Sequence, residues 1–129
     1  MADVNRGNRP LSPFMIGPYY RPQLTSMSSI MVRITGIAIL AIAPVLAAWL
    51  LSASSSETVY DFINGILGSW FGNLVMIGAT WALLYHMLGR LRHVLWDFGY
   101  CLDVPTSEKL AIGMFGGATL LTVFVWLVL

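Results

Sequence analysis

Three long stretches of this chain contain no charged side chain, and this limits the folds open to it more than any other feature. No Asp, Glu, Lys or Arg lies between Arg33 and Glu57, between Asp61 and Arg90, or after Lys109. Each stretch is about as long as the roughly 20 residues that a helix needs to cross a bilayer core, or longer. Backbone in lipid must satisfy its own hydrogen bonds, so we expect each stretch to be a helix.

The sequence therefore predicts an all-α membrane protein with three transmembrane helices, near residues 31–53, 64–90 and 109–129. The whole chain, residues 1–129, is short enough to form a single membrane domain. Residues 1–25 are predicted to be an extended cytoplasmic segment, because a continuous helix there is excluded by prolines. These are Pro10, Pro13, Pro18 and Pro22.

The basic residues set the predicted orientation in the membrane. In a three-span arrangement all of them fall on one side: Arg6, Arg9, Arg21, Arg33, Arg90, Arg92 and Lys109. The positive-inside rule makes that side cytoplasmic, with the N-terminus inside and the C-terminus periplasmic. The first residues show no signal or transit peptide, which favours a bacterial inner membrane. The net charge of +1 gives no indication of a nucleic-acid partner.

Both histidines lie near the end of the second apolar stretch. His86 and His93 are seven residues apart, so on a helix they share one face, roughly 10 Å apart along the axis. His86 is still inside the apolar stretch, and an imidazole at that depth indicates a functional site. The residue types leave three roles open for His86: a haem ligand, a hydrogen bond between helices, or part of a proton pathway. His93 is more simply an interfacial polar residue, and its spacing of four residues from Asp97 would allow the two to pair on the helix surface.

Haem ligation by His86 carries a consequence for assembly. The two axial ligands of one haem lie on opposite faces of the macrocycle, whereas His86 and His93 point the same way from one helix. If two histidines hold the haem, the second must come from another chain. Gly89, one turn after His86, leaves space beside the imidazole for a flat cofactor or for a neighbouring helix.

A second polar pair marks the start of the first apolar stretch. Ser29 and Arg33 are four residues apart and share one helix face near the membrane surface. Arg33 is either a snorkelling interfacial arginine or, with Ser29, a site for the carbonyl of a quinone or a carboxylate. One of the residues from Thr25 to Ser29 is expected to N-cap this helix through its side-chain oxygen.

Three motifs in order along the chain resemble one family. They are Arg9-Pro10-Leu11-Ser12-Pro13, the segment from Ser29 to Gly36 with Arg33, and the segment from His86 to Tyr100 with Arg92-His93 and Asp97-Phe98-Gly99-Tyr100. Together they resemble the cytochrome b membrane-anchor subunit of succinate dehydrogenase (Complex II, succinate:quinone oxidoreductase). The resemblance covers nearly the whole chain, including its length and its three spans.

The resemblance implies one subunit of an electron-transport complex of the tricarboxylic acid cycle. A flavoprotein subunit oxidises succinate and an iron–sulfur subunit passes the electrons to ubiquinone. Two membrane-anchor subunits, of which this chain would be one, share haem b and help to form the ubiquinone site. No catalytic residue, and no activity of the chain alone, is expected.

The same resemblance assigns roles to particular residues. His86 matches the axial ligand of the haem iron, and Ser29 and Arg33 match the ubiquinone site. Arg33 also matches a position on the haem propionate side, and His93 matches a position that is either structural or close to the haem. Ile30 would form an apolar wall of the quinone site.

The chain departs from the family pattern at two positions. Val32 and Phe14 stand where the family usually has histidine, which leaves the propionate contacts open. Two other functions also remain open: a haem-free quinone-binding anchor of a succinate or fumarate oxidoreductase, and a small transporter subunit with His86 on a proton path. A transporter predicts acidic residues inside the membrane, and none lies between Asp61 and Arg90.

Overall fold

The structure, a computed structural model, describes residue 14 and residues 20–128. Its elements are four helices: α1 (Leu24–Ser55), α2 (Glu57–Leu67), α3 (Trp70–Asp97) and α4 (Val104–Val128). Three of them, α1, α3 and α4, are long and apolar enough to cross a membrane. The prediction of an all-α protein with three transmembrane helices is confirmed. Most of the predicted extended N-terminal segment, residues 1–13 and 15–19, lies outside the described residues.

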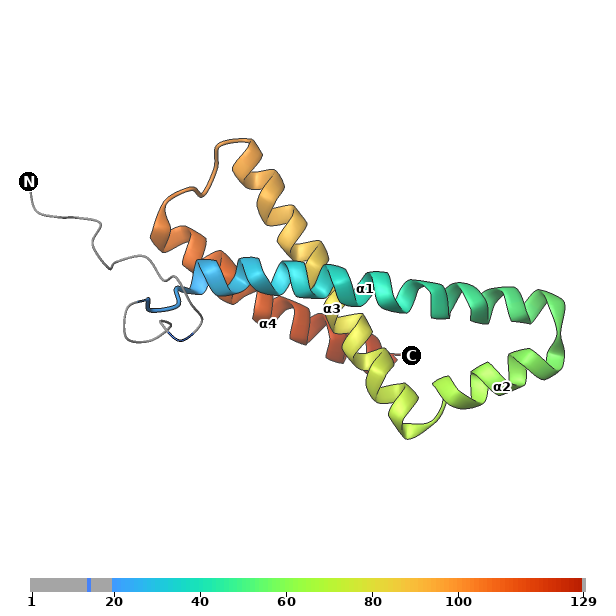
Figure 1. The fold of residues 1–129 in the computed structure, drawn as a ribbon. Coiled ribbons are helices and arrows are strands. Elements are labelled where there is room, and N and C mark those ends of the chain that lie inside the picture. Colours follow the sequence, from blue (N-terminus) through green and yellow to red (C-terminus); the bar gives the residue numbers. More distant parts are fainter. Residues whose placement is uncertain (1–13, 15–19, 129) are drawn as a thin grey trace, which may run out of the picture.

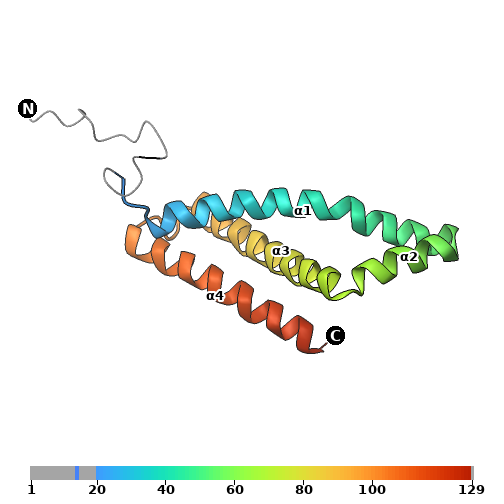
Figure 2. The same cartoon turned by 60° about the horizontal axis from the view of Figure 1, so that its bottom comes forward.

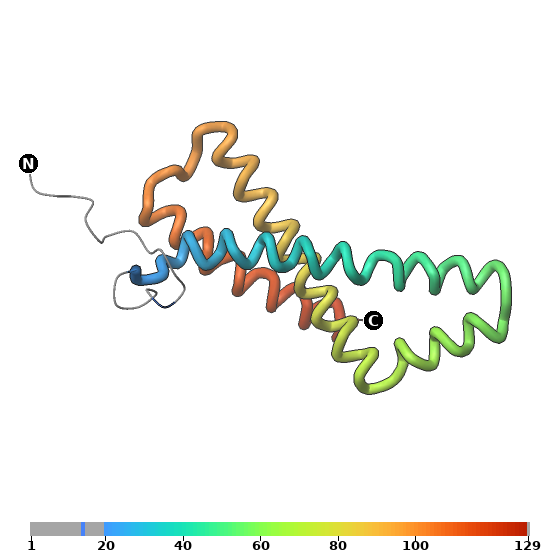
Figure 3. The backbone as a smooth tube through the Cα atoms, viewed as in Figure 1, coloured from blue at the N-terminus to red at the C-terminus, as the bar shows by residue number. Residues whose placement is uncertain are grey.

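Helix α3 is the central element of the bundle. It contacts both α1 and α4, and it lies between them in Figure 2. In Figure 1, α1 crosses α3 at a steep angle, and the N-terminal end of α1 lies beside the start of α4. The tube in Figure 3 shows that the second half of α1 leaves the bundle and that α2 turns back towards it.

Helix α2 was not expected. The sequence pattern predicted a second span beginning near residue 64 and assigned no helix to the residues just before it, whereas the structure has a separate helix from Glu57 to Leu67. The Oγ of Ser56 accepts from the N–H of Val59 at the start of this helix. A count of apolar residues misses this helix because its first turns mix charged and apolar side chains.

The bounds of the long helices also differ from those of the predicted spans. Helix α1 begins at Leu24 rather than near residue 31, and α4 begins at Val104 rather than near residue 109. Helix α3 begins at Trp70 rather than near residue 64, and it continues to Asp97. Hydropathy marks only the part of a helix that lies in hydrocarbon, whereas backbone hydrogen bonding continues into the polar region.

The predicted N-cap of α1 is wrong. The helix begins one residue before the Thr25–Ser29 segment, and Gln23, which precedes it, makes no side-chain cap bond. The hydroxyl of Ser28 instead donates to the carbonyl of Thr25, inside the helix. The hydroxyl of Ser28 is therefore used within α1 and towards α3, and that of Ser26 accepts from the hydroxyl of Tyr20.

The core lies where α1, α3 and α4 meet. Tyr85 of α3 is fully buried there. Its ring stacks on Trp81 with the centroids 5.0 Å apart, and it lies 4.8 Å from the ring of Phe115 in α4. Val32 of α1 and Met114 of α4 complete the contact. Most other large apolar side chains point outward, as expected for helices that face lipid or other membrane subunits.

Candidate functional site

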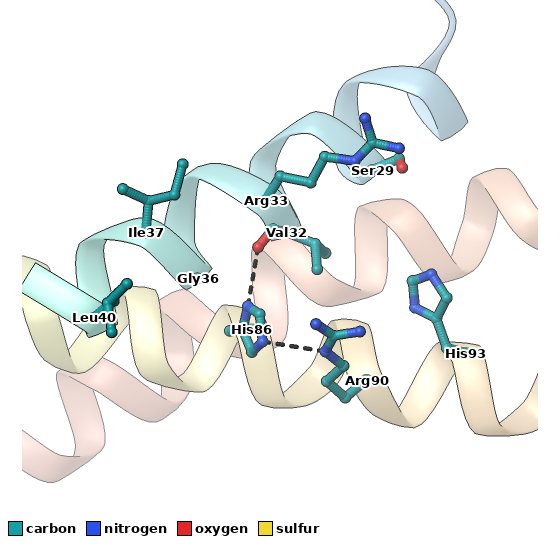
Figure 4. A pocket seen from close by; sticks show the side chains of 9 residues that line it. All are labelled: Ser29, Val32, Arg33, Gly36, Ile37, Leu40, His86, Arg90 and His93. Atoms are coloured by element: carbon teal, nitrogen blue, oxygen red, sulfur yellow. Dashed lines mark hydrogen bonds between the residues drawn. The ribbon is translucent and has the colours of Figure 1, made fainter.

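A groove between α1 and α3 holds most of the residues that the sequence pattern selected. Its volume is about 660 Å³. We call it the α1–α3 groove (Figure 4). It is lined by Ser29, Val32, Arg33, Gly36, Ile37, Leu40, His86, Arg90 and His93. Residues more than 50 positions apart in the chain thus form one site because α1 crosses α3 at this point.

The imidazole of His86 is fixed at both nitrogens. Its Nδ1 lies 2.9 Å from the carbonyl oxygen of Val32, and its Nε2 lies 3.2 Å from the Nε of Arg90. A carbonyl only accepts and an arginine N–H only donates. The two bonds together therefore require a neutral imidazole with its proton on Nδ1 and a lone pair on Nε2.

Gly36 makes room for this ring on α1. A Cβ atom at this position would lie 3.0 Å from Cε1 and 3.3 Å from Nδ1 of His86. A larger side chain would push the imidazole off the carbonyl of Val32. The glycine of the Ser29–Gly36 motif is thus explained by a close approach of α1 to the histidine.

Ser29 and Arg33 lie on the same side of α1 as the groove, as their spacing predicted. Ser29 is half-buried and Arg33 is exposed. The guanidinium of Arg33 makes no hydrogen bond or ion pair with any other residue in the described part of the chain. A hydroxyl and an uncommitted cation at the mouth of an apolar groove suit a polar oxygen of a ligand.

His93 lines the groove further along α3 (Figure 4). Its Nδ1 lies 2.7 Å from the carbonyl oxygen of Gly89, and its ring meets Trp96 edge-on at 5.2 Å. The pair with Asp97 that the spacing allowed does not form: no hydrogen bond or ion pair joins these two residues, both of which the structure describes. The helix carbonyl one turn back is nearer to the imidazole than the exposed carboxylate is.

Two further expectations from the sequence concern the space beside Gly89 and the position of Ile30. The space beside Gly89 belongs to neighbouring helices, because a Cβ there would lie 2.5 Å from Cγ2 of Val32 and 3.2 Å from Cε of Met114. Ile30 does not line the α1–α3 groove and is 45% exposed. Its role as an apolar wall of a quinone site stays a prediction.

Two arginines of α3 were not assigned roles from the sequence. Arg90 donates to His86 in the groove. Arg92 is only 3% exposed, and its Nη1 donates to Oγ of Ser28 at 2.8 Å while its guanidinium stacks 4.3 Å from the ring centre of Trp96. The sequence did contain a signal for the burial of Arg92, because Tyr85, Gly89 and Arg92 follow one another at the helical spacing of a buried face.

The class of protein follows from these features. A bundle of membrane-crossing helices presents a neutral imidazole, a serine and two arginines in one groove near a helix end. The family model that describes the transmembrane subunit of succinate dehydrogenase and fumarate reductase matches residues 5–125.

Curated relatives agree with this family over nearly the full length of the chain. The chain is 40% identical over 128 residues to the succinate dehydrogenase cytochrome b556 subunit of Paracoccus denitrificans, which covers 99% of this chain and 97% of the relative. It is 32% identical over 126 residues to the cytochrome b560 subunit of Reclinomonas americana, covering 94% and 86%. It is 27% identical over 118 residues to the cytochrome b556 subunit of Rickettsia conorii, covering 92% and 90%.

The chain therefore belongs to the family of succinate dehydrogenase/fumarate reductase transmembrane subunits. The resemblance stated from its motifs is confirmed, and so is its place as a multi-pass membrane subunit of an oxidoreductase complex.

Proposed function

We propose that this chain is the cytochrome b anchor subunit of a succinate dehydrogenase, and that it shares a b-type haem with a second anchor subunit and helps to form the ubiquinone site. The observation that carries the proposal is the convergence of His86, Ser29 and Arg33 in the α1–α3 groove. The names of the relatives support the haem, because they are called cytochromes b.

The residues of the groove fit a haem. An axial histidine must be neutral and must keep a lone pair on one nitrogen, while its other N–H bonds to an acceptor. His86 meets both conditions through the carbonyl of Val32. Apolar side chains of α1, Ile37 and Leu40, line the same groove and are 69% and 74% exposed, so the wall that they form lacks a cover in the single chain.

That missing cover supports the need for a partner. If His86 holds a haem, α1 and α3 would supply only part of its enclosure, and a second membrane subunit would supply the rest together with the second ligand. When bound, the haem supplies a site that accepts and returns single electrons. His86 would hold the iron through Nε2, the carbonyl of Val32 would orient the imidazole, and the cations of the groove would offset the propionate charges.

The quinone role rests on Ser29 and Arg33. A hydroxyl and a guanidinium near a helix end orient a carbonyl oxygen, while the apolar groove accommodates the rest of a quinone ring. The side on which these residues lie is the predicted cytoplasmic side, where an iron–sulfur subunit and a flavoprotein subunit would dock. In this arrangement the N-terminus is cytoplasmic, the C-terminus is periplasmic, and residues 1–129 form one domain.

The substitution Arg33→Ala tests the quinone role in the purified complex. We expect ubiquinone reduction by succinate to fall at least tenfold, because a charge-assisted hydrogen bond to the quinone is lost. Succinate oxidation by an artificial acceptor should be unchanged. Lys109→Ala, which removes a cation outside the groove, is the matched control. Loss of both activities in Arg33→Ala alone would mean an assembly defect, and unchanged ubiquinone reduction would contradict the role.

A further inference from the structure

Arg90 donates a hydrogen bond to Nε2 of His86, the nitrogen that would bind a metal. Its Nε lies 3.2 Å from Nε2 of His86, one helical turn away on α3. The Nδ1 of the same ring is already committed to the carbonyl of Val32. Nε2 has a single lone pair, so it cannot accept from Arg90 and bind iron at the same time.

The hydrogen bond from Arg90 to His86 has two physical effects. It holds the neutral tautomer and the orientation of the imidazole, because an arginine is always charged and donates only. It also places a charged donor on the ligand atom, and such hydrogen bonds are about twice as strong as neutral ones. Figure 4 shows Arg90 in its bond to His86, and because the residue is exposed its side chain has room to turn away.

We propose that Arg90 is a displaceable cap on the haem-ligating nitrogen of His86. In the haem-free chain it keeps the imidazole ready for ligation, and iron must displace it to bind. This inference rests on the proposed function, because it takes His86 as the axial ligand. It adds a residue that controls the loading of haem rather than one that holds it.

Arg33 provides an internal control for charge. It lines the same groove and carries the same charge, but it makes no bond to His86. A general electrostatic effect on an anionic porphyrin would appear in variants of both arginines. Competition for Nε2 would appear only at Arg90.

The test uses the four-subunit complex purified from cells that cannot make haem. The rate constant for binding is measured with haemin and, separately, with iron-free protoporphyrin IX, which carries the same propionates and takes no axial ligand. The readout is the ratio of the two rate constants. We expect Arg90→Gln to raise this ratio roughly tenfold, as loss of a hydrogen bond from a charged donor implies. Arg33→Gln should leave the ratio unchanged.

The outcomes separate the inference from the proposed function. An unchanged ratio in Arg90→Gln, or an equal rise in Arg33→Gln, would overturn the cap. Equal haemin binding in the wild type and in His86→Tyr would instead overturn haem ligation by His86. Arg90→Met has a similar length and no donor, so it replaces Arg90→Gln if that complex fails to assemble, and the same tenfold rise is expected.

Discussion

Arg92 of α3 donates from Nη1 to the hydroxyl of Ser28 of α1 over 2.8 Å, and this bond ties the two helices together one residue before the groove serine. Ser28 is fully buried, and its carbonyl accepts from the hydroxyl of Tyr85 at 3.3 Å. The Nε of Arg92 is buried without a hydrogen-bond partner. The position of Ser29 in the groove therefore depends on a polar contact of the preceding residue on a neighbouring face of α1.

Removal of the Ser28 hydroxyl should destabilise this contact. Ser28→Ala leaves Nη1 of the buried Arg92 with only a weak acceptor, Met114 Sδ, 3.6 Å away. We therefore expect the free energy of unfolding to fall by about 1–3 kcal/mol. The measurement is resistance of the purified complex to unfolding in a titration with sodium dodecyl sulfate. Ser54→Ala, an exposed serine whose hydroxyl bonds only within α1, should change stability by less than about 0.5 kcal/mol. Equal effects in the two variants would contradict the assignment.

The contact between α1 and α3 should not tolerate a methyl group at Gly89. Because a Cβ there would lie 2.5 Å from Cγ2 of Val32, Gly89→Ala must separate the helices or turn the valine. We expect overpacking to lower the free energy of unfolding by about 1–3 kcal/mol in the same titration. Gly78→Ala lies on the same helix with nothing within 4 Å of the added Cβ, and it should be nearly neutral. If Gly89→Ala left the free energy of unfolding unchanged, α1 and α3 would have to lie further apart in the protein than in this structure.

The start of α4 should lose protection at low pH. The hydroxyl and the backbone N–H of Thr106 bond to Asp103 and lower the pKa of its carboxyl from 3.8. A lowered folded-state pKa means that this stabilisation is complete above the unfolded value and is lost as the pH falls through the folded one. Hydrogen exchange at the amide of Thr106 should therefore show protection that declines only below about pH 4.

Asp103→Asn provides the control for that titration. The amide keeps an acceptor oxygen but has no charge, so the protection at Thr106 should be lower and independent of pH. The same decline with pH in Asp103→Asn as in the wild type would show that another group is responsible.

The spacing of the charged residues was sufficient to predict the three spans, because an uncharged stretch of this length in lipid must satisfy its own backbone hydrogen bonds as a helix. It did not predict α2, because a short helix with Glu57 and Asp61 in its sequence gives no apolar stretch. Four residues that the sequence selected line one groove, namely Ser29, Arg33, His86 and His93, and their roles stay predictions. The role of Arg90 was not accessible from spacing, because it depends on which nitrogen of His86 faces α1.

The packing partners were also beyond the sequence. Gly89 was compatible with a cofactor or a helix, and only the crossing of α1 over α3 shows that Val32 fills the space. Arg92 was counted as a cytoplasmic charge, yet it is buried against Trp96 and Ser28. A single sequence shows the type of a side chain, whereas its surroundings depend on helices that are distant in the chain.

The central claim is that His86 is an axial ligand of haem, and one spectrum tests it most directly. The dithionite-reduced minus oxidised absorbance spectrum of the detergent-purified complex is recorded for the wild type and for His86→Tyr. We predict a low-spin b-type spectrum in the wild type that is lost or shifted in the variant, because a phenol replaces an imidazole at the iron. An identical b-type spectrum in the variant would contradict the claim, and the absence of haem in the wild type would favour a haem-free quinone-binding anchor.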